Sequence, residues 1–194
     1  MKKKSLLVTL PLLFMAITIS AQEAKYEFKS AIIKKTLEMM GRKIEGTEYI
    51  DDYGNLSSAT IANVRTVYLG DEKTFTTVDL EKKIGEKRLE TKKSLNISKA
   101  TPEEIEKYTI VELGEEEYLG KTCKKYSYYD TRMGQKFKIF AWVWKGVSLK
   151  LIYYSGDGEG VAIMEYITEF QENVTVDPEH FSIPADADIK FKDS

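Results

Sequence analysis

Residues 137–154 of this chain read FKIFAWVWKGVSLKLIYY, and this stretch decides the fold. Two largely apolar runs are separated only by Lys145-Gly146, and a glycine in such a pair favours a tight turn. In the second run every other residue from Val147 to Tyr153 is apolar, which is the period of side chains on one face of a strand. The stretch therefore predicts a β-hairpin with strands at 137–144 and 147–154.

The same alternation and turn chemistry extend to both sides of this hairpin. Met40-Gly41, Asp51–Asn55, Gly70–Lys73 and Asp130–Gly134 contain the residue types that favour turns. Strands joined by short turns pair antiparallel, because parallel pairs need long crossovers. We therefore expect one antiparallel sheet of about nine strands or more. The other expected strands lie near residues 26–32, 42–51, 61–68, 74–79, 122–129 and 161–172.

One segment carries a clear helix start. Thr101 is a capping residue, Pro102 takes the first helical position, and Glu104 completes the capping pattern. We expect a helix of about eight residues that turns Ile105 and Tyr108 inward and ends before Gly114.

Other segments have weaker signals. Residues 80–100 are densely charged, so we expect one helical turn over Asp79–Ile84 and then a loop or irregular crossing. Glu115–Glu117 is expected to be a solvated turn, and Gly156–Gly160 a hairpin tip rather than a phosphate loop, because it opens no helix. The tail after Pro178 is apolar enough to dock on a sheet edge.

The strand at 137–144 is apolar on both faces. One face carries Phe137, Ile139, Ala141 and Val143, and the other carries Phe140, Trp142 and Trp144 beside Lys138. Such a strand is covered on both sides, or one of its faces lines an apolar groove.

The aromatic row is the candidate binding site. Pockets for lipids are mostly apolar with a few polar groups. The alternative to a pocket is a filled core packed under the helix that starts at Thr101. The candidate groove residues are Phe140, Trp142, Trp144, Tyr153 and Tyr166.

The first 21 residues have the pattern of a secretory signal peptide. Lys2–Lys4 precede an apolar run from Leu6 to Ile19, and small Ala21 stands at the expected cut. The run is too short for a membrane span, which needs about 20 residues. We expect cleavage after Ala21, a single domain over residues 22–194, and a periplasmic or secreted product that is not an integral membrane protein.

Composition excludes several classes of partner. The 31 acidic and 29 basic residues are mixed along the chain, so no basic stripe predicts nucleic-acid binding. One cysteine and one histidine form no metal-ligand set, and no catalytic triad order is present. Asp51, Asp52 and Asn55 have oxygens suited to calcium, but not the spacing of a helix–loop–helix site. We expect no cofactor, no metal and no enzymatic activity.

Cys123 is open to three interpretations. It is a buried apolar residue, it pairs with a second chain, or it is a nucleophile that would need His180, the only histidine, as its base. The sequence favours the buried residue.

Several short motifs resemble a group of exported proteins of unknown function from Gram-negative bacteria. This group is similar to the outer-membrane lipoprotein carrier and sorting (LolA-like) superfamily. The resemblance implies a mainly β (α+β) fold, a curved open antiparallel half-barrel with one or two short helices across its concave, apolar face, where the known carriers shield acyl chains. No ligand contact carries over residue by residue, and residues 80–100 depart from the pattern. The motifs are KYEFKSAII (25–33), YIDDYG (49–54), YLGKTC (118–123), WVWKGVSLK (142–150), ENV (172–174) and FSIP (181–184).

These observations lead to two functional hypotheses. The first is a periplasmic non-enzymatic protein that binds a lipid, an acyl chain or a lipidated partner in the half-barrel groove. The alternative is a structural or interaction module of the envelope with a filled core and no small ligand. A distant third is a carboxylate hydrolase, which would need a polar cleft with converging acids.

The signal peptide gives the first test. When the full chain is expressed in a Gram-negative host, the periplasmic product should begin at Gln22, because the small Ala21 is the expected cleavage position. The intact mass and N-terminal peptide of the recovered protein check this. An uncleaved N-terminus that stays with the membrane would contradict it.

Overall fold

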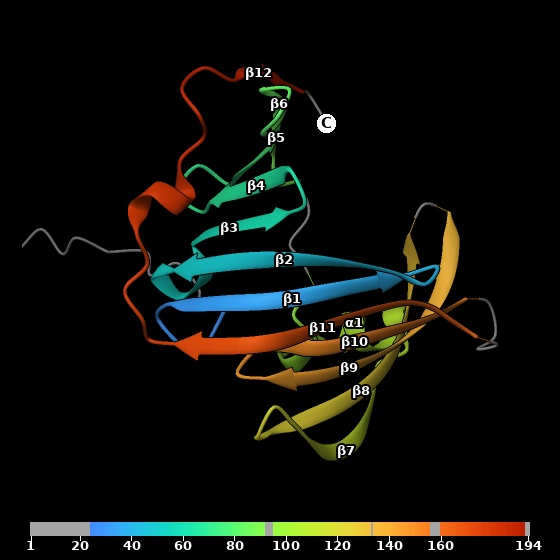
Figure 1. Ribbon diagram of the computed structural model, residues 1–194. Coiled ribbons are helices and arrows are strands. Elements are labelled where there is room, and N and C mark those ends of the chain that lie inside the picture. The colour runs from blue at the N-terminus through green and yellow to red at the C-terminus, as the bar shows by residue number, and fades with distance from the viewer. Residues whose placement is uncertain (1–23, 92–94, 133, 156–159, 193–194) are drawn as a thin grey trace, which may run out of the picture.

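The computed structural model describes residues 24–91, 95–132, 134–155 and 160–192. Twelve strands form one sheet in the order β12-β6-β5-β4-β3-β2-β1-β11-β10-β9-β8-β7 (Figure 1). The predicted signal peptide and the tip at 156–159 lie outside the described residues. The strands are β1 (Ala31–Met39), β2 (Arg42–Asp51), β3 (Leu56–Ile61), β4 (Val64–Leu69), β5 (Thr74–Asp79), β6 (Ile84–Leu89), β7 (Val111–Tyr118), β8 (Lys121–Arg132), β9 (Gln135–Trp144), β10 (Val147–Ser155), β11 (Val161–Glu172) and β12 (Asp188–Phe191).

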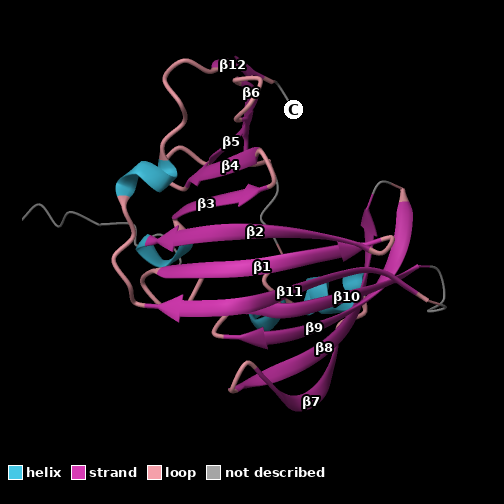
Figure 2. Cartoon of the chain, in the orientation of Figure 1, coloured by secondary structure: helices cyan, strands magenta, loops and turns pink. Residues whose placement is uncertain are grey.

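Hairpins build both halves of the sheet, which confirms the mainly β antiparallel prediction. The pairing of β1 with β11 joins the two halves, and only β12 on β6 is parallel. At the β9–β10 turn, Lys145 and Gly146 have φ of 47° and 84°, the backbone that a two-residue hairpin turn requires. The sheet is open and twisted, with short helices on its faces (Figure 2).

Four register shifts interrupt the ladders of the described strands, and two of them affect the candidate site. One shifts the β1–β11 register between Lys34 and Lys35, and the other shifts the β9–β10 register between Ser148 and Lys150. A bulge adds one residue to one strand, so it bends that strand and changes which side chains share a face.

The predicted helix is present as α1 (Pro102–Tyr108), with the full capping box between Thr101 and Glu104. Figure 1 draws α1 behind the sheet, and Tyr108 packs against the buried residues of β8, β9 and β10. The prediction for Ile105 was wrong, since its side chain is 44% exposed.

Three local predictions need correction. Residues 25–29 form bends rather than a strand, because the backbone of Lys25 and Tyr26 bonds to the Tyr53 carbonyl outside any ladder. Within residues 80–100, β6 pairs with β5, so Leu80–Lys83 is a hairpin turn and not a helical turn. Glu115–Glu117 lie within β7, whose pairing with β8 supplies the backbone bonds.

The tail docks as predicted. The 3-10 helix η3 (Pro178–Phe181) places Phe181 on a small cluster around Val67, and β12 adds to the sheet edge beside β6. His180 of η3 stacks on Tyr49 with ring centroids 3.6 Å apart.

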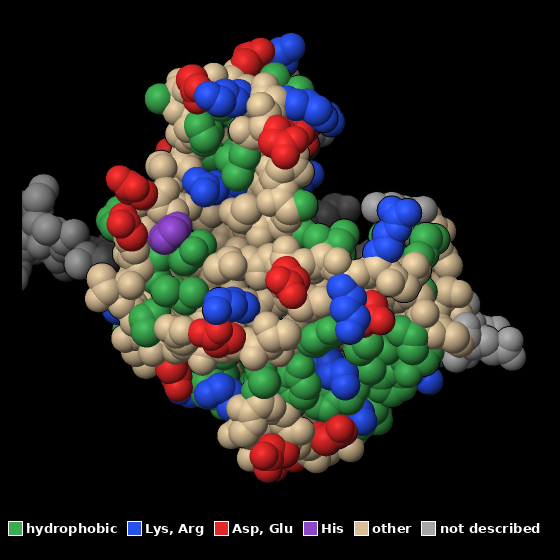
Figure 3. Space-filling view, in the orientation of Figure 1, with side chains coloured by type: hydrophobic (Ala, Val, Ile, Leu, Met, Phe, Trp, Pro, Cys, Tyr) green, Lys and Arg blue, Asp and Glu red, His purple; other side chains and the backbone are tan. Residues whose placement is uncertain are grey.

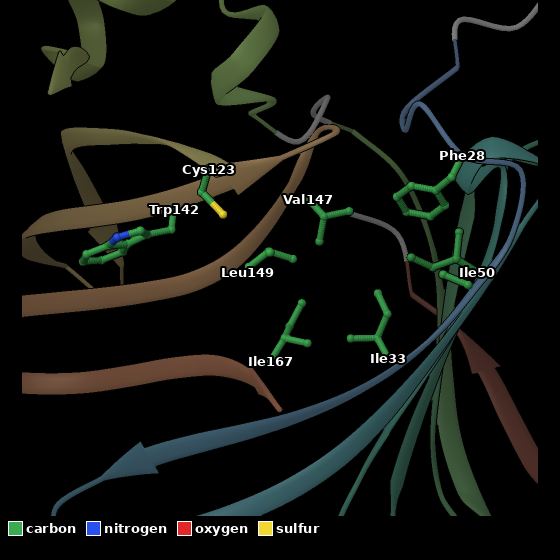
Figure 4. Close-up of a cluster of buried hydrophobic side chains, with 9 residues drawn as sticks. Phe28, Ile33, Ile50, Cys123, Trp142, Val147, Leu149 and Ile167 are labelled. Carbon is green, nitrogen blue, oxygen red and sulfur yellow. The ribbon is translucent and has the colours of Figure 1, made fainter. Parts of the chain in front are cut away.

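Two larger clusters form the core. The first gathers where the N-terminal segment meets the sheet, and Figure 4 shows Trp142 and Cys123 at one end and Phe28 and Ile50 at the other. The second lies under α1 and the 3-10 helix η2 (Ile97–Lys99), around Ile139, which is fully buried. The face of β9 that the helices cover is therefore the one with Phe137, Ile139, Ala141 and Val143, whereas the filled-core alternative expected the aromatic row under the helix.

The second cluster predicts a stability difference between two isoleucines. Ile139→Ala should lower the free energy of unfolding by about 2–5 kcal/mol, because it leaves a cavity in a closed cluster. Ile84→Ala, at a position that is 53% exposed, should cost far less. Urea denaturation of the two variants measures this. Equal losses would show that the face of β9 under α1 is not the core.

Candidate functional site

A cavity of about 610 Å³ lies on the side of the sheet that α1 covers. Its walls are formed by the N-terminal segment, the segment around Asn96 (the crossing), the start of α1, and the sheet. The apolar part of the lining includes Leu95, Val147 and Leu151. The polar part includes Lys25, Glu48, Asn55, Lys73, Glu90, Asn96, Lys99, Glu104, Ser148 and Glu165.

Lys35 forms ion pairs with two glutamates on the cavity side of the sheet. Its Nζ lies 3.0 Å from Glu48 and 3.6 Å from Glu165. Burial lowers the pKa of Lys35, but the charges and hydrogen bonds of the two glutamates outweigh it, so the net pKa is raised. The interior of this half-barrel is therefore charged and ion-paired where the resemblance implies an apolar surface.

Two tyrosines form the aromatic part of the cavity wall. Burial, with the charge of Glu48 nearby, raises the pKa of Tyr26 far above its ordinary value, so its hydroxyl stays neutral. Burial and a hydrogen bond to Glu90 raise the pKa of Tyr68 to about 12. The Lys25 ammonium lies 5.3 Å and 5.8 Å from the centroids of these two rings. The two rings therefore provide flat apolar surfaces next to the charged ammonium group of Lys25.

The ion-paired residues beside the cavity carried a weak sequence signal. Lys35 shares a strand face with Ile33 and Leu37, and a charge at that period indicates an inward lysine. Nothing in the sequence indicates that Glu48 and Glu165 would converge on it, because they are 117 positions apart and meet only when β1 pairs with both β2 and β11.

The predicted aromatic row lies mostly on the other face of the sheet. Directly opposed residues point to the same side. One such row is Lys125, Trp142, Lys150 and Tyr166, and the next contains Phe140, Ile152 and Met164. We call the surface formed by Phe140, Trp142, Ile152, Tyr154, Met164 and Tyr166 the outer patch.

Tyr153 and Trp144 lie apart from this patch. Tyr153 is opposite Ile139, packs in the cluster under α1 and is 2% exposed. Trp144 contacts Phe170 edge-on at 5.3 Å, with the Lys121 ammonium 3.9 Å from its centroid. The structure thus brings Phe140, Trp142 and Tyr166 together and separates the other two.

A bulge explains why Tyr153 leaves the row. Trp144 is opposite Val147, so an unbroken hairpin would place Tyr153 opposite Lys138, on the face of Phe140. The extra residue at Leu149 shifts the register by one, and a shift of one residue moves a side chain to the opposite face.

The remaining candidate residues have structural roles. Cys123 is fully buried, its pKa is raised by burial, and His180 stacks on Tyr49 in a different cluster, so the two form no nucleophilic pair. Asp51 and Asp52 bond to the backbone and side chain of their own turn. Among the described residues, no group of three His, Cys, Asp or Glu side chains could hold a metal.

A second cavity, of about 550 Å³, lies between the sheet and the docked tail. Its lining is mainly polar and includes Thr36, Thr47, Arg65 and His180. Arg65 donates to the hydroxyl of Thr60 and to the carbonyl of Ser182, so its guanidinium fastens the tail to β3 and β4.

No protein-family model matches the sequence, and no curated protein matches it either. Solved structures do match. An uncharacterized conserved protein from Thermus thermophilus is 10% identical, with a TM-score of 0.60 over 86% of this chain and 92% of that one. MucB in the MucA/MucB complex of Pseudomonas aeruginosa is 13% identical, with a TM-score of 0.55 over 84% of this chain and 58% of that one.

These likenesses show the fold alone. This chain spans 58% of the matched MucB chain, so it corresponds to part of that protein. An outer membrane lipoprotein-sorting protein domain from Vibrio parahaemolyticus is also similar, at 13% identity over 81% of this chain and 92% of that one, but its TM-score of 0.29 carries no argument. The likeness to the Thermus protein and to MucB is thus a distant structural similarity without a sequence family. No helix among the described residues has the length and apolar character of a membrane span.

The ion pairs of Lys35 predict that substitutions at two neighbouring lysines differ in their effect on stability. Lys35→Met should lower the free energy of unfolding by about 3 kcal/mol near neutral pH, because it leaves two partly buried carboxylates without their cation. Lys34→Met is the matched control, since its partner Glu169 is at the surface and the effect should be small.

The pH dependence of this difference has a definite sign. The pKa of Lys35 is raised in the folded state, so its contribution is complete below the unfolded lysine pKa of about 10.4 and is lost as pH rises through the folded value. Urea denaturation at neutral and strongly alkaline pH should show the gap between wild type and Lys35→Met closing. A gap independent of pH would contradict the pairing.

Proposed function

We propose that this chain is a non-enzymatic protein of the bacterial cell envelope that binds an amphipathic lipid, or the acyl chain of a lipidated partner, in the cavity under α1. The observation that carries the proposal is the cavity itself, whose volume suits a small ligand. Export to the periplasm follows from the predicted signal peptide, and the likeness to MucB supports an envelope location.

The chemistry of the lining selects the class of ligand. Leu95, Val147 and Leu151 offer apolar contact, worth about 25 cal/mol per Å² of apolar surface removed from water. Lys25 and Lys99 lie on the same walls and can pair with a polar or anionic head group. A ligand with an acyl chain and a polar head fits both parts, whereas a purely apolar chain would leave the charged groups desolvated without partners.

The mechanism is reversible burial. The ligand's apolar part leaves water for the space between the sheet and α1. The helix has few buried side chains, so it is the least constrained cover of the cavity. No bond is made or broken.

A second candidate is an interaction module that binds a protein segment in the same place. The specific observation in its favour is that a structural neighbour, MucB, was solved in complex with MucA. The two candidates differ in what occupies the cavity, so one set of variants tests both.

Uptake of a lysophospholipid tests the proposal. Native mass spectrometry of delipidated protein should show a one-to-one adduct with lysophosphatidylethanolamine. Ser148→Phe puts a ring into the cavity and should weaken uptake by at least about tenfold. Thr122→Phe, a position on β8 outside the cavity lining, is the control and should bind like wild type.

The outcomes separate the candidates. Equal uptake by both variants would place the ligand elsewhere. No uptake by wild type, together with an empty mass for protein purified from its own periplasm, would overturn the lipid proposal and favour the interaction module.

A further inference from the structure

The outer patch is an aromatic surface crossed by lysines. Figure 3 shows hydrophobic side chains gathered over β8 to β11, on the face away from α1, with basic side chains among them. Phe140, Ile152, Met164 and Tyr166 are half-buried, while Trp142 is 5% exposed and forms the floor. No helix of the described residues covers this face; the end of β7 reaches it, where Tyr118 packs against the cluster that contains Trp142 and its ring lies 5.7 Å from the Lys150 ammonium.

Lysine side chains lie over the aromatic rings. The ammonium groups of Lys125 and Lys150 are 4.6 Å and 4.9 Å from the Trp142 centroid, and that of Lys138 is 5.5 Å from the Phe140 centroid. In this arrangement the aliphatic stem covers the ring and the charge stays at the surface. The patch therefore presents apolar contact and positive charge together.

The positive charge is only partly compensated. At the border of the patch, Glu116 pairs with Lys125 at 2.7 Å and Glu38 pairs with Lys43 at 3.5 Å. Lys138 and Lys150 have no carboxylate of the described residues within salt-bridge distance. The patch thus has a local positive excess on a chain whose formal net charge is −2.

The form of the patch limits what can bind it. It spans three strands of the sheet interior, β9 to β11, roughly 10 Å from the first strand to the third, and neither cavity extends onto it. The backbone groups there are paired within the ladders, so an extended peptide cannot add as a strand. A second copy of the chain would place lysines against lysines, which repel. The binding partner that fits the patch is therefore a flat surface with complementary negative charge.

We propose that the outer patch docks this protein on an anionic membrane surface. Tyr154 and Tyr166 lie at the depth of the lipid head groups, where an apolar ring with a polar tip is favourable. Lys138 and Lys150 pair with anionic phosphates and extend their stems along the patch. The cavity under α1 then faces away from the membrane, so the two surfaces act independently.

The fluorescence of the protein's own tryptophans can report this docking. Of its only two tryptophans, Trp142 forms the floor of the outer patch and Trp144 lies apart from it, against Phe170. The purified protein is mixed with vesicles of phosphatidylcholine alone, or of phosphatidylcholine with phosphatidylglycerol, at low and high salt. Sedimentation measures binding, and brominated phosphatidylcholine in the vesicles quenches tryptophans that contact lipid.

Variants locate the contact. Wild type should sediment with the phosphatidylglycerol vesicles at low salt, with tryptophan quenching, and be released by high salt. Lys138→Glu with Lys150→Glu should weaken binding by at least roughly tenfold, since each lysine near an anionic surface contributes about fivefold. Lys29→Glu with Lys107→Glu changes the net charge equally at exposed positions elsewhere and should bind like wild type.

The proposal is overturned if wild type does not bind, if both double variants lose binding equally, or if binding occurs without quenching. Thermal unfolding confirms that each variant is folded. Equal binding to vesicles without phosphatidylglycerol would point to a purely apolar contact and also overturns it. Ser148→Phe, which fills the cavity, should dock normally, so failure of the cavity proposal and failure of this one are distinguishable.

Discussion

The apolar character of both faces of β9 is the constraint on which the rest of the structure depends. A strand with two apolar faces must keep water from both. On one side the crossing and α1 cover Ile139 and Ala141. On the other side lysines from β8 and β10 lie over Trp142. One cover is made of backbone segments and the other of side chains alone. The sheet therefore has an enclosed side and an open side.

The enclosed side is not uniformly apolar because its cover is made of polar segments. The N-terminal segment, the crossing and the start of α1 are rich in lysine, glutamate and asparagine, so the space between them and the sheet is lined by charge as well as by leucine and tyrosine. Lys35 prevents two glutamates from facing each other without a cation. A cavity of this composition favours ligands with a polar end.

On the open side, lysine side chains cover the sheet in place of a helix. A lysine stem shields an aromatic ring from water without removing the ammonium group from the surface, so the sheet stays folded while the patch keeps its charge. A helix in the same place would bury the aromatic side chains and leave no binding surface. Under the two proposals, the same sheet holds a ligand on one face and contacts a charged surface with the other.

Local chemistry in the sequence was sufficient for many elements. The capping box at Thr101, the Lys145-Gly146 turn and the alternation from Val147 onward act over a few residues, so they predicted α1 and the β9–β10 hairpin. Strand β6 was missed because its residues are charged and half-exposed near the edge of the sheet, where pairing with β5 rather than burial holds them.

At the candidate site, the local sequence pattern accounts for some of the contacts and the assembled sheet for the others. Alternation along β9 determined that Phe140 and Trp142 share a face. The assembled sheet decided which face α1 covers, that Glu48 and Glu165 meet at Lys35, and that Tyr153 lies with Ile139. The last outcome follows from one extra residue in β10, since side chains alternate with a period of two and a single-residue bulge exchanges the faces of everything beyond it.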